Sequence, residues 1–275
     1  MHRITIGNVE VTALLDAHVL MNPTQLMPDR AEEFNREYGH LANEQGLYPM
    51  SITCYLVRSA GKNILIDTGL GGRKRPGFPR ANLPESLKNA NIDPAEIDII
   101  VNTHLHVDHV GWNTVEDEDG KTRVFFPNAK WIIQKDEWEF WMTPEHMDNP
   151  AYPHLRECVA PIESHVELVT KEQAVDEHLT FIPAPGHTPG HVAIGIASNG
   201  ERAVIVGDAS HHPVQLDHPD WSPVFDWDKE LAARSRDQLF EMAANDGRTW
   251  LAGHWEHPGI GRIVRLEGKR VFQAL

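Results

Sequence analysis

The 275-residue chain has little cysteine, no long apolar run and a deficit of positive charge. Its two cysteines, Cys54 and Cys158, lie far apart and form no Cys-x-x-Cys pair, which argues against a disulfide framework and against a thiolate zinc site. No stretch approaches the roughly 18 consecutive apolar residues of a membrane span, and the first residues carry no apolar secretory segment. We therefore expect a cytoplasmic protein without a membrane partner.

Basic residues are outnumbered by acidic ones, 25 to 40, so the formal net charge is −15. This charge repels a phosphate backbone, which excludes nucleic acid as an expected partner. An apolar content of 41% and a charged content of 24% are ordinary for a globular protein, and glycine and proline follow no period. Disorder, collagen and coiled coil are therefore excluded.

Alternating strand and helix patterns predict an α/β protein. Two hairpins are expected, at 4–6 with 9–15 and at 51–58 with 63–67, and an apolar run predicts a buried strand at 97–102. The remaining patterns predict a helix start near 93, helices at 135–141 and 229–245, and strands at 124–126, 130–134, 179–183, 191–197, 202–207 and around 263–272. Because no linker composition or repeat interrupts this order, we expect one domain over 1–275, with an N-terminal arm at 21–50 and an insert at 143–161.

Histidine is the residue type in excess, with 17 copies unevenly placed. Directly after the predicted 97–102 strand, four ligand-type side chains fall within six positions: His104, His106, Asp108 and His109. In an extended segment His104 and His106 point to the same side, and a turn can direct the other two toward a neighbouring point. Imidazole and carboxylate groups suit zinc, and also iron, manganese or cobalt. The segment predicts a metal site in preference to a polar surface loop.

Three further candidate ligands also follow predicted strands or apolar runs: His187, Asp208 and His254. Such positions let a rigid sheet aim side chains at a common point. Each of the three alone is more typical of a turn or a solvated histidine. Together with the 104–109 segment they complete a set of seven ligand-type residues, which suits an open catalytic pair of metals better than a closed structural site.

The order His-x-His-x-Asp-His, then His, Asp and His, resembles the signature of the metallo-β-lactamase-fold hydrolases, and the resemblance spans about 52–261. It implies an α/β fold, a four-layered αββα sandwich, and two divalent metal ions, zinc before iron, manganese or cobalt. By this resemblance one ion is held by His104, His106 and His187, the second by Asp108, His109 and His254, and Asp208 bridges them. Asp67, in Asp-Thr-Gly, matches the family's aspartate that orients a ligand.

Segments 207–215 and 254–261 look most like the branch of methyl parathion hydrolase and the N-acyl homoserine lactonases. Two ions that share a water lower its pKa from about 15.7 toward about 7, so a metal-bridging hydroxide can attack an electrophile. The resemblance implies a lactonase or esterase of the quorum-quenching type, and a phosphotriesterase of the methyl parathion hydrolase type is the nearest alternative. A thioesterase, a β-lactamase, an iron-dependent redox enzyme and a non-catalytic metal-stabilised module are further alternatives.

The remaining assignments concern proton transfer and the substrate. Asp108 and Asp208 are both candidate proton shuttles. His211 stands where N-acyl homoserine lactonases commonly carry a tyrosine, and it either meets the substrate or lies behind the ligands. His191, His212 and His257 are left outside the ligand set. A neutral, hydrophobic small molecule is the expected substrate, and relatives leave a homodimer open. Five aromatic residues either wall an apolar pocket or belong to the core: Trp112, Trp141, Trp221, Phe225 and Trp255.

Overall fold

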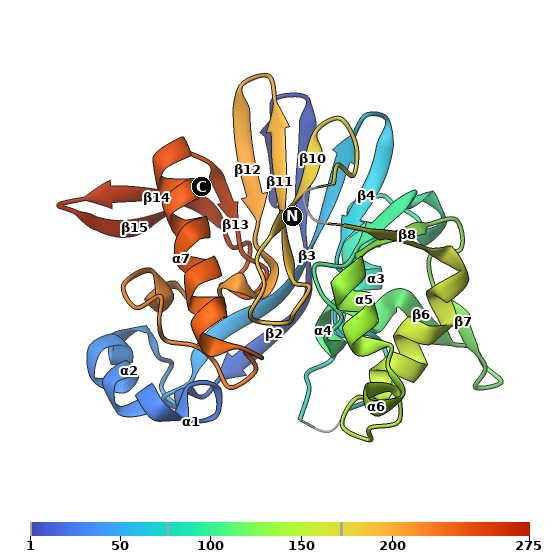
Figure 1. Cartoon of the computed structure of the whole chain (residues 1–275), viewed down its shortest axis with the longest axis horizontal. Coiled ribbons are helices and arrows are strands. Elements are labelled where there is room, and N and C mark those ends of the chain that lie inside the picture. Colours follow the sequence, from blue (N-terminus) through green and yellow to red (C-terminus); the bar gives the residue numbers. More distant parts are fainter. Residues whose placement is uncertain (1, 76, 171–172) are drawn as a thin grey trace.

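Two β-sheets stack face to face in the computed structural model, which describes residues 2–75, 77–170 and 173–275 (Figure 1). In spatial order, the first sheet contains β1 (His2–Ile6), β2 (Val9–Met21), β3 (Tyr48–Ser59), β4 (Lys62–Ile66), β5 (Ile99–Val101), β8 (Lys130–Gln134) and β9 (Val166–Val169). The second contains β10 (Leu179–Pro183), β11 (Val192–Ser198), β12 (Glu201–Ile205), β13 (Thr249–Leu251), β14 (Ile260–Leu266) and β15 (Lys269–Ala274). A separate small hairpin pairs β6 (Thr114–Glu116) with β7 (Thr122–Val124).

Strand direction divides the first sheet into two parts. Strands β1 to β4 are antiparallel, whereas β4, β5, β8 and β9 run parallel. In the second sheet only the β12–β13 pair is parallel. The carboxyl ends of parallel strands meet at one edge of a sheet, so the loops that follow β4 and β5, and those that follow β12 and β13, open on shared edges.

Helices cover the outer face of each sheet (Figure 1). On the first sheet lie α3 (Leu83–Asn89), α4 (Val107–Val110), α5 (Lys135–Trp141) and α6 (Pro144–Met147), and on the second lies α7 (Lys229–Asp246). The α7 helix begins where the Asp228 side chain accepts the N–H of Leu231, and it ends at Gly247, whose φ of 63° suits glycine. The predicted αββα layering is therefore confirmed.

The main core fills the space between the sheets. Alternate residues of each strand point inward, as the period of two requires, so that Val11 and Val57 of the first sheet share one buried cluster with Phe181 and Ile194 of the second. These four side chains are essentially inaccessible to solvent. The core holds the loops at the sheet edges at a fixed separation.

The N-terminal hairpin is longer than the sequence pattern predicts. Strand β2 continues past a bulge between Leu15 and Ala17 and pairs with β3 as far as Met21 opposite Tyr48. Between these strands lie α1 (Pro23–Leu26) and α2 (Ala31–Tyr38), and Phe34 of α2 is fully buried against Tyr48, with ring centroids 4.7 Å apart. The segment is thus docked by an aromatic cluster of its own.

Two local predictions are wrong in detail, and some elements were not predicted. The helix expected near 93 is a single 3-10 turn, Pro94–Glu96, closed by a capping box between Asp93 and Glu96. The strand expected at 124–126 lies two residues earlier, as β7 (Thr122–Val124). It pairs with β6 in the small hairpin and belongs to neither main sheet. Strand β9 and helix α3 have no counterpart among the predicted elements. None of the described helices is both long and apolar enough to cross a lipid bilayer.

Candidate metal centre

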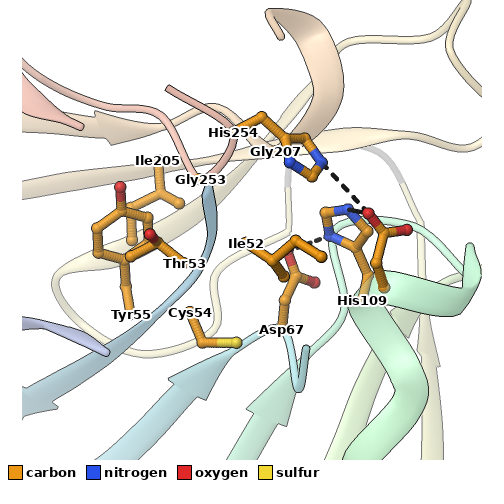
Figure 2. A pocket seen from close by; sticks show the side chains of 11 residues that line it. Ile52, Thr53, Cys54, Tyr55, Asp67, His109, Ile205, Gly207, Gly253 and His254 are labelled. Atoms are coloured by element: carbon orange, nitrogen blue, oxygen red, sulfur yellow. Dashed lines mark hydrogen bonds and ion pairs between the residues drawn. The ribbon is translucent and has the colours of Figure 1, made fainter. Parts of the chain in front are cut away.

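The seven predicted ligands converge at the carboxyl ends of strands from both sheets. The 104–109 segment follows β5 and leads into α4, His187 follows β10, Asp208 lies in a 3-10 turn after β12, and His254 follows β13. Figure 2 shows His109 and His254, from opposite sheets, facing one another across the site; their ring centroids are 5.4 Å apart. The chain brings together residues up to 150 positions apart through the edge loops of two stacked sheets.

One group of ligand-type atoms surrounds a single oxygen of Asp208. The Nδ1 atom of His106 lies 3.0 Å from His104 Nε2 and 2.9 Å from His187 Nε2. The Oδ2 atom of Asp208 lies 3.2 Å from His187 Nε2 and 3.7 Å from His104 Nε2. We call His104, His106 and His187 the first set.

A second group surrounds the other oxygen of the same carboxylate. Asp208 Oδ1 lies 2.9 Å from His109 Nε2 and 3.0 Å from His254 Nε2. Asp108 Oδ2 lies 3.6 Å from His254 Nε2 and 3.9 Å from His109 Nε2. We call Asp108, His109 and His254 the second set. The two oxygens of Asp208 thus face two different sets.

The donor chemistry of these atoms fits divalent metal ions. His109 Nε2 and Asp208 Oδ1 are buried and lie 2.9 Å apart, yet neither makes a hydrogen bond of regular geometry with the described residues. In the first set three imidazole nitrogens approach one another, although each ring has too few protons to satisfy every contact as a hydrogen bond. A cation at the centre of such a group accepts the lone pairs that otherwise repel each other. Within the described residues, both sets form groups whose ligand atoms lie within 4.8 Å of one another.

The electrostatics of the cluster keep His104, His106 and Asp208 in the forms that metals bind, whereas Asp208 and the neighbouring carboxylates outweigh burial and raise the pKa of His109, His187 and His254. Burial, reinforced by neighbouring imidazoles, holds the pKa of His104 and of His106 well below its usual value. Burial opposes ionisation of Asp208, but the surrounding histidines, His109 foremost, hold its pKa well below its usual range. His104 and His106 are therefore neutral and Asp208 is ionised, as ligation requires.

Each set has side chains behind it that orient its imidazoles. Asp67 accepts hydrogen bonds from the backbone N–H and hydroxyl of Thr103, at 2.8 and 2.9 Å, and its Oδ2 lies 2.8 Å from Nδ1 of His109. Its φ of 61° is in the left-handed region that non-glycine residues rarely adopt. The Nδ1–H of His254 donates to the carbonyl of Ser51 at 2.9 Å. These contacts leave Nε2 of His109 and of His254 directed at Asp208.

Two buried carboxylates near the site were missed by the sequence analysis. Glu137 of α5 accepts four hydrogen bonds, and its donors flank the ligands of two loops: the N–H of Leu105, the indole of Trp141, the hydroxyl of Thr188 and the N–H of Gly190. Asp226 lies 2.9 Å from Nδ1 of His187. Neither belongs to a recognisable motif; the one sequence signal is that aromatic residues follow Glu137 and flank Asp226.

His211 lies beside Asp208. Its Nε2 is 3.1 Å from Asp208 Oδ2, and its ring stacks on that of His254 with centroids 5.3 Å apart. Its Nδ1 is buried without a hydrogen-bond partner among the described residues. With Asp208 and His254 it forms a further group of closely spaced ligand atoms. His211 therefore contacts the cluster directly.

The other three histidines that the sequence analysis left out of the ligand set have different partners. His191 Nε2 accepts the backbone N–H of Asp208 at 2.9 Å, and burial lowers its pKa to about 3. His257 Nδ1 lies 3.2 Å from the Thr53 hydroxyl. His212 accepts the N–H of Val214 at 3.3 Å. The structure places all three around the site as supports for backbone and side chains.

The five aromatic residues that were candidates for a pocket wall separate into different environments. Trp141 contacts His106, with ring centroids 5.4 Å apart. Trp221 and Trp255 are buried in two other clusters, and Trp112 donates its indole N–H to Asp16. Phe225 is 56% exposed. Trp141 thus lines the first set, whereas Trp221 and Trp255 serve as core.

Acidification should destabilise the fold partly through His212. Burial lowers the pKa of His212 to about 4 from an ordinary value of 6.5, so between these pH values the unfolded chain binds a proton that the native state does not. The contribution of neutral His212 to the free energy of unfolding is complete above pH 6.5 and is lost as the pH falls from 6.5 through about 4. This loss amounts to up to about 3 kcal/mol. His212→Asn keeps an acceptor for Val214 and should give a shallower loss, measured by urea unfolding of chelator-treated protein. An unchanged pH slope would contradict this assignment.

Stacked sheets with helices outside them, and a histidine and aspartate cluster at the strand ends, define a metal-dependent hydrolase. The family model of the metallo-beta-lactamase superfamily matches residues 47–254, so the chain belongs to this superfamily. The predicted family and fold are therefore confirmed, and the chain is a metallo-hydrolase.

Individual proteins of known sequence or structure are also similar to this chain. An N-acyl homoserine lactonase of Bacillus sp is 25% identical over 226 residues, covering 76% of this chain and 82% of the relative. The crystal structure of hydrolase AbOPH has 28% identity and a TM-score of 0.85, covering 100% of this chain and 97% of that one. AidC, a dizinc quorum-quenching lactonase solved with a product, has 25% identity, the same TM-score and the same coverage.

Proposed function

We propose that this chain hydrolyses lactones or carboxylic esters, with N-acyl homoserine lactones as the first substrate class to test. The carrying observation is that the two oxygens of Asp208 each lie about 3 Å from imidazoles of a different set. This is the arrangement that two adjacent divalent ions require of a bridging carboxylate. The curated relatives named as N-acyl homoserine lactonases support the choice of substrate.

Each of the two sets would supply the ligands of one ion. His104, His106 and His187 would hold one ion, Asp108, His109 and His254 the other, and Asp208 both. Zinc is the proposed metal because the ligands are nitrogen and oxygen donors and because AidC is a dizinc enzyme. Two ions bound in this way supply an activated water and polarise the electrophilic oxygen of the substrate.

Three side chains of the site would have separate roles in proton transfer, metal bridging and substrate binding. Asp108, whose side chain is 22% exposed, is better placed than Asp208, at 5%, to pass a proton to a leaving group. Asp208, with one carboxylate oxygen facing each set, would fix the position of one set relative to the other. His211, beside Asp208, is placed to donate a hydrogen bond to a substrate oxygen.

His211→Ala should lower kcat by about 10²-fold while the metal content stays that of the unaltered enzyme. The reason is that His211 contributes a polar contact to the reacting group, whereas each set keeps its three ligands without it. Initial rates and elemental analysis on the same sample measure the two effects. His178→Ala, at a surface histidine outside the site, is the control. Loss of an ion from the His211→Ala enzyme would instead make His211 a ligand.

The proposed substrate is tested by rates on a panel. Purified, metal-loaded enzyme is assayed on acyl homoserine lactones, aryl esters, an aryl phosphotriester, a thioester and a cephalosporin, alongside elemental analysis. We expect the largest kcat/KM on a lactone. Phosphotriesters are the second candidate because segment 207–215 resembles the methyl parathion hydrolase branch and because both substrate classes are uncharged. A preference for the phosphotriester, or no turnover of any lactone or ester, would overturn the proposal.

A further inference from the structure

A fully buried arginine lies on the inner face of α7. Arg236 lies among the buried residues of α7, which are apolar at Leu239, Phe240 and Ala243 and include one further polar residue, Ser235. Its side chain is 0% exposed. A charge in such a place is retained only if it is fully hydrogen-bonded and paired.

The guanidinium of Arg236 reaches toward the metal centre in two directions. Its Nη2 donates to Asp226 Oδ2 at 3.0 Å, and its Nε donates to the carbonyl of Ala209 at 2.7 Å. Its Nη1 donates to the carbonyl of Pro219 and contacts the Ser222 hydroxyl. Ala209 is the residue after Asp208, so one side chain joins the turn of Asp208 to the loop of Asp226.

Asp226 connects Arg236 to His187 of the first set. Its Oδ1 accepts the Nδ1–H of His187 at 2.9 Å, so both carboxylate oxygens are occupied and the side chain is 0% exposed. The backbone supports the same docking, because the N–H of Trp227 donates to the carbonyl of His187 at 3.1 Å. With Nδ1 engaged, His187 presents Nε2 to His106 and Asp208.

We propose that Arg236 is a positioning residue: anchored on the carbonyl of Ala209, it orients His187 through Asp226, and by this route it sets metal affinity in the first set selectively. This inference rests on the metal assignment of the proposed function. The pairing also matters for charge, since Arg236 compensates Asp226. Asp226 therefore orients His187 as an ionised hydrogen-bond acceptor while adding no net charge to the centre.

The second set has a partner of its own, Asp67, which lies directly behind His109. The N–H and hydroxyl of Thr103 donate to the same carboxylate, and that hydroxyl also lies 3.1 Å from Nδ1 of His104. Asp67 therefore contacts the second set directly and reaches the first set only through Thr103, and no described contact joins Asp67 to Arg236. Substitution of Asp67 should act mainly on the ion of the second set, whereas substitution of Asp226 should act on the ion of the first.

The experiment is chelator competition on the cobalt-loaded enzyme, followed by visible absorption and by proton NMR of the shifted, exchangeable imidazole N–H signals. Asp226→Asn should weaken one ion by about 10–100-fold and leave the other within about 2-fold, and Arg236→Met, which also frees the carbonyl of Ala209, should weaken the same ion at least as much. The His187 N–H signal should broaden by faster exchange in these variants. Arg236→Lys keeps a positive charge beside Asp226 and should recover part of the lost affinity.

Two control variants fix the interpretation. Asp67→Asn should weaken the other ion and broaden a different N–H signal. Asp237→Asn, next to Arg236 on α7 and paired at the surface with Arg270, should leave both affinities unchanged. If Arg236→Met does not fold, Asp226→Asn and Arg236→Lys decide the question.

The inference is overturned if Asp226→Asn and Arg236→Lys bind both ions as tightly as the unaltered enzyme does. It is also overturned if Asp226→Asn and Asp67→Asn weaken binding of the same ion. Since no substrate is used, this outcome is separate from that of the proposed function. An enzyme that binds two ions but hydrolyses no lactone refutes the substrate alone. An enzyme that binds fewer than two ions refutes the selective role of Arg236.

Discussion

Asp208→Ala should abolish hydrolysis, with a loss of kcat/KM greater than about 10³-fold, and should release at least one metal ion. Both carboxylate oxygens are engaged, one with each set, so the substitution removes a ligand from two places at once. The expected loss exceeds the roughly 10²–10³-fold cost of removing a single transition-state hydrogen bond. Initial rates and metal content measured on one sample check both expectations.

Two further variants separate charge from volume. Asp208→Asn keeps the size of the side chain but supplies no anionic bridge, so it should lose nearly as much activity as the alanine variant. Asp246→Ala removes a carboxylate that pairs with Arg248 at the far end of α7 and should leave rate and metal content unchanged. Full metal content with most of the activity in Asp208→Ala would remove this residue from the bridging role.

Glu137→Ala should lower the free energy of unfolding by about 4 kcal/mol and weaken metal binding in the first set. The residue is 0% exposed, and its removal leaves four buried donors without an acceptor, each of which costs about 1–3 kcal/mol when unsatisfied. Because those donors flank His104, His106 and His187, their relaxation should displace these ligands. Denaturant unfolding and metal titration measure the two effects.

The same helix offers a matched control for Glu137. Glu139 is exposed and pairs with Lys135 at 3.5 Å, so Glu139→Ala should cost no more than about 0.5 kcal/mol and leave the metal unaffected. Glu137→Gln should be intermediate, since its amide oxygen can accept from one pair of donors while its NH₂ group opposes the other. Equal effects of the 137 and 139 substitutions would show that the buried carboxylate does not support the ligand loops.

The candidate ligands could be found from the sequence because four of them lie within six positions. His104, His106 and the pair at 108–109 follow an apolar run that forms β5, and the spacing itself indicates a common site. Assignment of the more distant His187, Asp208 and His254 depended on the family resemblance, since each alone reads as part of a turn. The structure brings all seven side chains together, and their roles as metal ligands stay a prediction.

What the sequence did not reveal depends on contacts between distant segments. Glu137 and Asp226 act through donors 4 to 53 positions away, and nothing in their local pattern identifies the distant ones. The extension of β2 was missed because Asp16 and His18 interrupt the apolar alternation; Asp16 instead accepts the N–H groups of Leu70 and Leu83. Tertiary pairing with β3 overrides the local signal.

The candidate ligands are divided between the two sheets, four after β5 and three after strands of the other sheet. The distance between the two halves of the ligand set is therefore fixed by side chains that never touch it, such as Val57 and Ile194 in the layer between the sheets. Trimming or enlarging that layer would shift one half of the centre against the other. Metal preference in this enzyme should thus be adjustable by remote repacking, and slow ion exchange in solution would report how often the two layers separate.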